Sequence, residues 1–383
     1  MLKELEAGNK VCKLNKALYG LRQAGRRWYV KLNEELKQFG LNRSNIDPCI
    51  YHMNQGEDLL LVAIYVDDLL VVSWNDTLIA GLAKYLSKKF EVRDLGRAKY
   101  CLGIEFSHEE SGIKMNQKGY INDILKRFGM VDSRPVSTPI DLGLKLKRIE
   151  TQTAEERNLP YRKLIGSLMY LAICTRPDIA YAVSYLSQYN SCFNKTHWVA
   201  AKRILRYLKG TSDLGLHFRK DSNSLKGYCD ADWGNCLEDR RSYTGYVFVL
   251  AGSPIAWESR KQRTVALSST EAEYMAMTEA TKEAICTRKF LIELNFDTLA
   301  DVTVLSDNNG AQKLAENPMF HNRTKHIDIR HHFVREALEN DLLKIQHVST
   351  NDMAADILTK GLSRPKHLKC IEQLGLDGIK INS

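Results

Sequence analysis

The segments KGYCDADW (226–233), TGYVFVLAG (244–252) and SPIAW (253–257) decide the fold of the C-terminal half of the chain. Their hydrophobic pattern predicts three strands that pair antiparallel. The residues that follow predict a long helix over 268–294, a strand over 302–307, helices over 309–316 and 324–339, a strand over 342–348 and a last helix over 351–360. This order of elements predicts one compact α/β domain of about 140 residues.

The first half of the chain has a mixed pattern of helices and hairpins. We expect a helix over 13–40, two apolar strands within 59–74 that meet at an acidic turn, a helix over 77–90, a hairpin folded at 109–112 and a helix over 119–130. Residues 133–158 are rich in Pro, Ser and charge, which predicts a linker or an extended connection. Two helices follow within 161–189, broken at Thr175-Arg176 because the residue before Pro177 disfavours helical geometry. A basic helix over 197–210 ends at Gly210.

Length and composition narrow the class of protein. The chain has 383 residues, with 55 Lys and Arg against 46 Asp and Glu, so its formal charge is +9. The apolar fraction of 44% excludes wholesale disorder, and the excess of base favours a polyanionic partner. The nine cysteines form no CxxC pair, which argues against a disulfide framework and a zinc ribbon. No signal peptide or apolar stretch of membrane length is apparent, so we expect a soluble, intracellular protein of the cytoplasm or nucleus that does not bind a membrane.

Four carboxylates of the C-terminal domain stand where an α/β domain gathers its site. Asp230 and Asp307 end strands, Glu273 lies in the first turn of the long helix, and Asp356 lies in the first turns of the last helix. Converging carboxylates repel one another unless cations neutralise them, so the expected occupants are two Mg²⁺ or Mn²⁺ ions. Two such ions activate a water and stabilise the leaving oxygen of a phosphodiester. The set predicts a nuclease.

Each of these residues also has a structural explanation. Asp230 and its neighbour Asp232 are ordinary strand-end residues, and Glu273 stands at capping-box spacing from Thr270, as Glu271 does from Ser268. Asp307 could start a turn, and Asp356 could stabilise the start of its own helix. The occurrence of all four in this order of elements favours the nuclease.

The motifs GYCDADWG, LSSTEAEYMA, LSDNNGA and STNDMAADILTK, with RTKHIDIRHHFVRE before the last, resemble the ribonuclease H domain of copia-type retrotransposon polyproteins. The resemblance implies a ribonuclease H-like α/β fold and metal binding by Asp230, Glu273, Asp307 and Asp356. Glu273 is preferred to Glu271 because Glu-x-x-Ala fits Glu273 to Ala276. The implied reaction is the Mg²⁺-dependent hydrolysis of the RNA strand in an RNA–DNA hybrid, which is recognised by its shape and 2′-hydroxyls.

Five histidines receive no metal role. His347 lies in a predicted strand rather than on a loop before the last carboxylate, so we assign it no catalytic part. The cluster of His321, His326, His331 and His332 lacks the ligand spacing of a zinc site. It predicts a polar surface that contacts nucleic acid or the body of the domain.

The first part of the chain resembles the reverse transcriptase of the same polyproteins. The segments KLNKALYGLRQAGRRWY (13–29), SNIDPCIY (44–51) and YVDDLLV (65–71) match the palm, an antiparallel sheet with helices. The resemblance implies that Asp67 and Asp68 bind catalytic Mg²⁺ together with a third Asp from an earlier strand. We find no clear candidate for that third residue, and Gly25 stands where the family usually has Pro. We therefore expect an incomplete palm that does not polymerise by itself.

The helices between Tyr161 and Gly210 resemble the thumb or connection region of the family. Their basic residues Lys202, Arg203, Arg206 and Lys209, together with Gln23 near the N-terminus, are predicted to bind nucleic acid. A solvated charged face explains the helix equally well.

Four domains are expected: a partial palm over 1–140, a helical connection over 141–222, a ribonuclease H-like domain over 223–362 and a tail over 363–383. The interpretation is a Pol polyprotein fragment with ribonuclease H activity, with other parts of the polyprotein as further partners. An inactive nucleic-acid-binding remnant and a partner-dependent reverse transcriptase subunit remain the alternatives.

Overall fold

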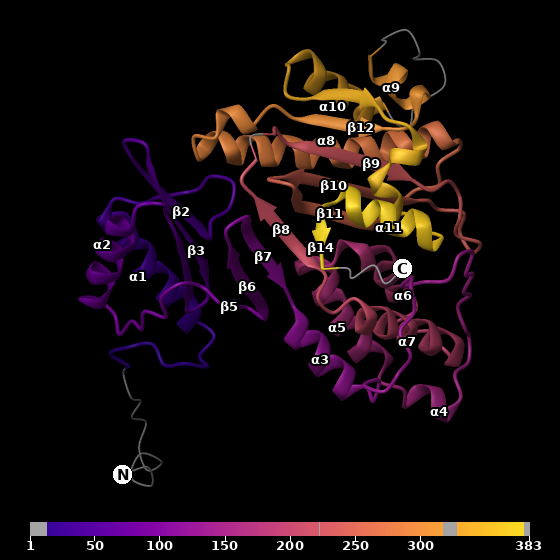
Figure 1. Cartoon of the computed structure of the whole chain (residues 1–383), viewed down its shortest axis with the longest axis horizontal. Coiled ribbons are helices and arrows are strands. Elements are labelled where there is room, and N and C mark those ends of the chain that lie inside the picture. The colour runs from indigo at the N-terminus through magenta and orange to yellow at the C-terminus, as the bar shows by residue number, and fades with distance from the viewer. Residues whose placement is uncertain (1–13, 222, 317–327, 379–383) are drawn as a thin grey trace, which may run out of the picture. The chain divides into compact units, whose positions relative to one another are not determined.

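The computed structural model describes residues 14–221, 223–316 and 328–378 of the chain (Figure 1). The chain divides into two compact units, residues 1–98 and residues 99–383, and each is described by itself. In the described ranges, no helix combines the length and apolarity that crossing a membrane requires. The eight cysteines within these ranges are free thiols.

The first unit is an antiparallel sheet with two helices. Its elements are α1 (Ala24–Phe39), β1 (Asn42–Arg43), β2 (Ile50–Gln55), β3 (Asp58–Tyr65), β4 (Asp68–Val72) and α2 (Asp76–Ser87), and the strand order is β1-β2-β3-β4. Leu32 and Leu36 of α1 pack with Leu60 of β3 and Leu82 of α2, which excludes water between the helices and the sheet. The two predicted apolar strands and their acidic turn are confirmed.

The predicted helix over 13–40 is wrong at its beginning, because the structure starts α1 only at Ala24. Residues 14–23 instead form bends and turns, with Gly20 at a φ of 90°. Leu14, Leu18 and Tyr19 are exposed, so this stretch buries no apolar face that would stabilise a helix.

The second unit contains a small antiparallel sheet assembled from distant parts of the chain. Its strands are β5 (Tyr100–Cys101), β6 (Ile104–Glu109), β7 (Gly112–Asn116), β8 (Gly215–Arg219) and β14 (Leu376–Asp377), in the order β14-β8-β7-β6-β5. The predicted hairpin between β6 and β7 is confirmed. β14, with two residues, is too short to give a hydrophobic period, and β8 was not among the predicted strands.

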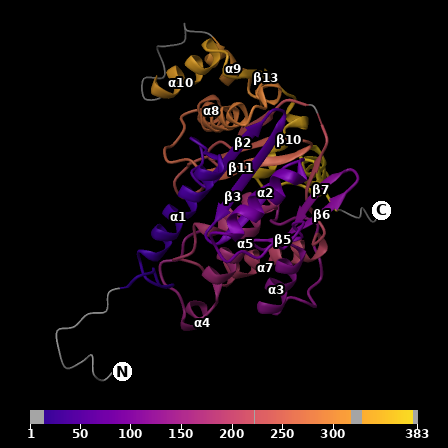
Figure 2. The ribbon, with the colours of Figure 1, turned by 90° about the vertical axis from the view of Figure 1, so that its left-hand side faces the viewer.

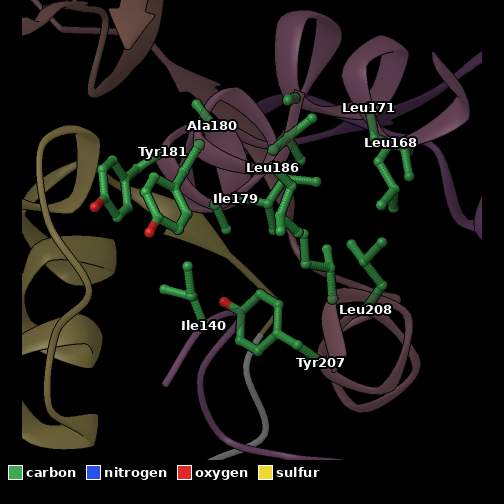
Figure 3. Close-up of a cluster of buried hydrophobic side chains, with 14 of the residues drawn as sticks. Ile140, Leu168, Leu171, Ile179, Ala180, Tyr181, Leu186, Tyr207 and Leu208 are labelled. Carbon is green, nitrogen blue, oxygen red and sulfur yellow. The ribbon is translucent and has the colours of Figure 1, made fainter. Parts of the chain in front are cut away.

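Helices fill the middle of the second unit. They are α3 (Lys118–Arg127), α4 (Ala154–Arg157), α5 (Tyr161–Cys174), a 3₁₀ turn η1 (Pro177–Ile179), α6 (Ala180–Ser187) and α7 (Lys195–Gly210). The predicted break before Pro177 is confirmed. Figure 3 shows Leu168 and Leu171 of α5, Leu186 of α6 and Leu208 of α7 gathered in one buried cluster. The segment predicted as a linker contains α4 at its end.

The C-terminal half of the second unit is the predicted α/β arrangement. Its strands are β9 (Lys226–Ala231), β10 (Tyr243–Leu250), β11 (Ser253–Lys261), β12 (Thr303–Ser306) and β13 (Lys344–His347), in the order β11-β10-β9-β12-β13. β9, β10 and β11 pair antiparallel, whereas β12 runs parallel to both β9 and β13. The helices are α8 (Ser269–Glu293), the 3₁₀ turn η2 (Asp297–Leu299), α9 (Asn309–Glu316) and α10 (Asp328–Glu339). α9 packs against both α10 and β13 (Figure 2).

The predicted last helix over 351–360 is wrong in type. The structure has two 3₁₀ turns there, η5 (Thr350–Asp352) and η6 (Ala354–Leu358), separated by Met353 with an extended ψ of 100°. All five residues of η6 are buried, so tertiary packing rather than a helical stripe fixes this segment. Beyond it, the helix α11 (Arg364–Gln373) packs against the body of the unit and leads into β14.

Candidate metal centre

Three of the four predicted carboxylates converge where two parallel strands end. Asp230 lies in β9, and Asp307 directly follows β12, which pairs with β9 through Leu305 and Tyr228. Glu273 reaches the same place from the second turn of α8, which packs on β9 (Figure 1). Oxygen atoms of Asp230, Glu273 and Asp307 all lie within 4.8 Å of one another.

Hydrogen bonds orient two of these carboxylates. The backbone N–H of Ala231 donates to Oε2 of Glu273 over 3.0 Å, and the hydroxyl of Thr359 donates to Oδ2 of Asp230. Asp230 and Glu273 are buried, whereas Asp307 is half-buried. These hydrogen bonds help to hold the two buried carboxylates in place.

The pKa shifts indicate that the positive charge near Asp230, Glu273 and Asp307 is too small to balance the negative charge of the three carboxylates. Burial, followed by the charges of Asp230 and Asp307, raises the pKa of Glu273 well above its ordinary value. Burial also raises the pKa of Asp230, although the nearby Lys360 opposes the shift. Oxygen donors in a negatively charged cluster suit a hard divalent cation such as Mg²⁺ or Mn²⁺. The residues present thus fit a divalent ion.

Asp356, the fourth predicted carboxylate, has a different environment. It is buried in η6, and its Oδ1 lies 2.7 Å from the Nζ of Lys360 while its Oδ2 lies 2.9 Å from the Nζ of Lys366. The same Lys360 Nζ is 3.4 Å from Oδ2 of Asp230. An ammonium group therefore lies between Asp230 and Asp356. Sequence reasoning missed both lysines, although Asp356 and Lys360 have the four-residue spacing of an ion pair.

The neighbouring acidic residues have structural partners of their own. Asp232 accepts a hydrogen bond from the backbone N–H of Tyr243, and burial raises the pKa of Asp232 to about 7. The capping role falls to Glu271, whose N–H donates to the hydroxyl of Ser268 and whose Oε2 accepts from the N–H of Leu267. Glu273 is therefore not needed for capping.

The acidic hairpin of the first unit is exposed. Asp67 lies in the two-residue turn between β3 and β4, and Asp68 begins β4. Val66 precedes them at a φ of 54°, a left-handed conformation that is strained for a β-branched residue. The indole N–H of Trp28 donates to the carbonyl of Val66 over 2.7 Å and holds the turn. Within the described part of the chain, Asp67 and Asp68 join no group of three candidate metal ligands.

The basic residues of α7 have partners within the chain. Arg203 lies 2.9 Å from Asp141, the Nε of Arg206 donates to the carbonyl of Arg134, and Lys209 donates to the carbonyl of Ser133. Lys202 lies over the ring of Trp198. These contacts fasten residues 133–141 to α7, a role that the sequence did not reveal. Gln23 is exposed at the start of α1.

The structure describes only part of the histidine cluster that the sequence predicts to form a polar surface. His321, His326 and the side chain of His331 lie outside the described residues, and His332 is an exposed residue of α10. His347 ends β13 and pairs with Ser306, in agreement with its predicted place in a strand.

Comparisons with known proteins place the chain among transposon proteins. Residues 3–142 match the family model of reverse transcriptase (RNA-dependent DNA polymerase). The chain is 44% identical over 380 residues to the retrovirus-related Pol polyprotein from transposon TNT 1-94 of Nicotiana tabacum, a match that covers 97% of this chain and 28% of that protein. It is also 32% identical over 277 residues to a Saccharomyces cerevisiae protein named for transposon Ty5-1, covering 71% of this chain and 89% of that protein. The chain spans about a quarter of the length of the curated Pol polyproteins that it matches.

Solved structures with which the chain shares similarity include a foamy viral protease-reverse transcriptase in complex with double-stranded DNA. That likeness has 14% identity and a TM-score of 0.45, and it covers 85% of this chain and 49% of the other. LC11-RNase H1 has 16% identity and a TM-score of 0.29, covering 36% of this chain and 93% of the other.

The fold itself agrees with the sequence relatives. The first unit is a palm-like antiparallel sheet with helices, and three antiparallel strands followed by a helix and two parallel strands give the last part of the chain a ribonuclease H-like arrangement. The reverse transcriptase match covers the first of these regions, and the Pol relatives extend across both. The chain belongs to the family of copia-type retrotransposon Pol polyproteins.

Proposed function

We propose that residues 223–362 form a metal-dependent ribonuclease H that cleaves the RNA strand of an RNA–DNA hybrid. The observation that carries this proposal is the convergence of Asp230, Glu273 and Asp307, whose oxygens lie within 4.8 Å of one another beside the ends of β9 and β12. Three ionised carboxylates from three separate elements repel one another unless a cation compensates their charge. The proposed substrate is a hybrid because its shape and 2′-hydroxyls distinguish it from DNA.

The residues of this chain have distinct parts in the proposed reaction. Asp230, Glu273 and Asp307 would hold the divalent ion, which would supply activation of a water and stabilisation of the leaving oxygen of the phosphodiester. Ala231 and Thr359 hold Glu273 and Asp230 in place through their hydrogen bonds. Burial and the charges of Asp230 and Asp307 raise the pKa of Glu273, and a divalent cation held beside it would favour the ionised form of this carboxyl.

The proposed division into a palm (1–140), a connection (141–222), the nuclease (223–362) and a tail (363–383) is supported by the reverse transcriptase match over 3–142. In the palm we propose Asp67 and Asp68 as metal ligands. Because they join no third ligand among the described residues, we expect the purified chain not to extend a primer. Primer extension on a primed RNA template in Mg²⁺ tests this, and robust synthesis would refute it.

Cleavage of a labelled RNA–DNA hybrid by the full chain in Mg²⁺ tests the nuclease. Asp307→Asn removes one ligand charge and should slow cleavage by about 100-fold or more. Asp301→Asn is the matched control, because Asp301 is exposed before the other end of β12 and pairs with Lys344. Cleavage by the wild type and by Asp301→Asn, but not by Asp307→Asn, is the expected result.

The alternatives give different outcomes in the same assay. An intact hybrid with salt-sensitive binding would indicate a nucleic-acid-binding remnant instead of an enzyme. Cleavage or synthesis that begins only when other Pol segments are added would indicate a partner-dependent subunit.

A further inference from the structure

Lys360 lies between two of the acidic residues of the candidate metal centre. Its Nζ is 2.7 Å from Oδ1 of Asp356 and 3.4 Å from Oδ2 of Asp230. Both carboxylates are buried, whereas the side chain of Lys360 is 35% exposed. The ammonium group of Lys360 thus bridges two candidate metal ligands. Because the side chain is partly exposed, this group has a route to solvent.

The second lysine at this centre is fastened more firmly. Lys366 lies 2.9 Å from Oδ2 of Asp356, and its Nζ also donates to the carbonyls of Thr350 and Asn351 over 2.7 and 3.0 Å. These carbonyls keep Lys366 in place whether or not Asp356 changes partners. Of the two ammonium groups, Lys360 is therefore the one that can leave with less loss of contacts.

The two lysines compensate the charges of the four carboxylates unequally. Asp356 has an ammonium group on each oxygen, while Glu273 and Asp307 have none within ion-pair distance in the described structure. When all four carboxylates and both ammonium groups are ionised, their net charge is −2. One divalent ion balances that charge, and a second would meet the ammonium of Lys360 as a like charge.

We propose that Lys360 acts as a built-in cation between Asp230 and Asp356, so that the protein without nucleic acid binds one divalent ion and admits a second only when Lys360 moves away. The first ion binds at Asp230, Glu273 and Asp307. This inference rests on the proposed metal-dependent function and narrows the predicted two-ion site to a centre that fills in two steps. Lys360 is a positioning residue for the second ion.

Counting bound Mn²⁺ tests the inference without any cleavage assay. The full-length protein is titrated with Mn²⁺, and the free ion is measured by electron paramagnetic resonance. The wild type should bind one ion, and Lys360→Met should bind a second at least 10-fold more tightly than the wild type does. Lys360→Arg, which keeps the charge, should still bind one.

The matched control is Lys369→Met. Lys369 is an α11 lysine whose ion-pair partner is Asp352, 2.8 Å away, so its removal leaves the four carboxylates untouched. This variant should bind one Mn²⁺ like the wild type. Circular dichroism compares the folding of each variant with that of the wild type.

Two results would overturn the role of Lys360: two ions of similar affinity in the wild type, or an unchanged count in folded Lys360→Met. The first result is measured on the wild type alone, so the inference can be overturned even when Lys360→Met does not fold. Absence of any bound Mn²⁺ in the wild type would overturn the metal centre itself and with it the proposed function. Binding of one ion in the wild type and two in Lys360→Met, without cleavage of a hybrid, would support the role of Lys360 and contradict only the nuclease.

Discussion

Arg176 and Asp178 form a bidentate ion pair from which water is excluded. Nε and Nη2 of Arg176 donate to Oδ1 and Oδ2 of Asp178 over 2.8 and 2.7 Å, and both side chains have 0% exposure. The hydroxyl of Tyr207 also donates to Oδ2 of Asp178, and Nη1 of Arg176 donates to the carbonyl of Thr211. The pair thereby joins the 3₁₀ turn after α5 to the end of α7.

Removing one partner of this pair should be strongly destabilising. Arg176→Met leaves the charge of Asp178 buried without compensation, and we expect the free energy of unfolding in urea to fall by about 3–5 kcal/mol. The double variant Arg176→Met/Asp178→Leu should lose less than the sum of the two single variants, because it removes both charges. Simple additivity of the three values would contradict the coupling of these residues.

A buried histidine should make stability depend on pH. Burial lowers the pKa of His367 to about 4, and its Nε2 lies 3.1 Å from the hydroxyl of Tyr207. The unfolded chain takes up this proton near pH 6.5 and the folded chain only near 4, so the contribution of neutral His367 is complete above 6.5 and is lost as pH falls. We expect the free energy of unfolding to drop by about 2 kcal/mol between pH 7.5 and 5 from this group.

The variant His367→Gln isolates that contribution. Glutamine keeps a donor for the hydroxyl of Tyr207 but does not titrate, so urea unfolding of the variant should show a smaller loss between pH 7.5 and 5. An equal pH dependence in variant and wild type would show that other groups cause it.

Divalent ions should stabilise the folded chain. An ion that binds only the folded state at 100 times its dissociation constant adds about 2.7 kcal/mol, which a thermal melt detects as a shift of several degrees. Asp307→Asn should abolish the shift because it removes a ligand from the trio, and EDTA should reverse the shift in the wild type. Equal stabilisation of Asp307→Asn would mean that the ion binds elsewhere.

Lys202 and Arg206 should differ in their effects, although both belong to the predicted nucleic-acid surface of α7. Lys202 has no carboxylate partner among the described residues, so Lys202→Gln should weaken hybrid binding and reduce the slope of log affinity against log salt by about 1. Arg206→Gln removes the hydrogen bond to the carbonyl of Arg134 and should lower the free energy of unfolding by about 1 kcal/mol. Fluorescence anisotropy and urea unfolding measure the two effects, and unchanged binding of Lys202→Gln at every salt concentration would remove α7 from the interface.

The elements of this fold were predictable where hydrophobic periods are long. The apolar strands around Asp67 and the succession of strands and helices from β9 onward follow from residue patterns, because burial of one face requires those periods. The break before Pro177 follows from the restriction that proline places on the residue before it. The start of α1 and the 3₁₀ geometry of η6 were not predictable, because Leu18 is exposed where a helix would bury it and Asp356 lies in a segment buried on all sides.

By itself, the sequence determined the family and predicted four carboxylates for the candidate centre, because residue types and their order along the chain are properties of the chain alone. The structure brings three of the four together. Only the tertiary structure decided that Asp356 is neutralised by Lys360 and Lys366 and that the bases of α7 bind residues 133–141. Ion pairs depend on through-space distance, and strand pairing such as that of β14 with β8 depends on where distant segments meet. The compensation of charge within the site therefore had to come from the fold.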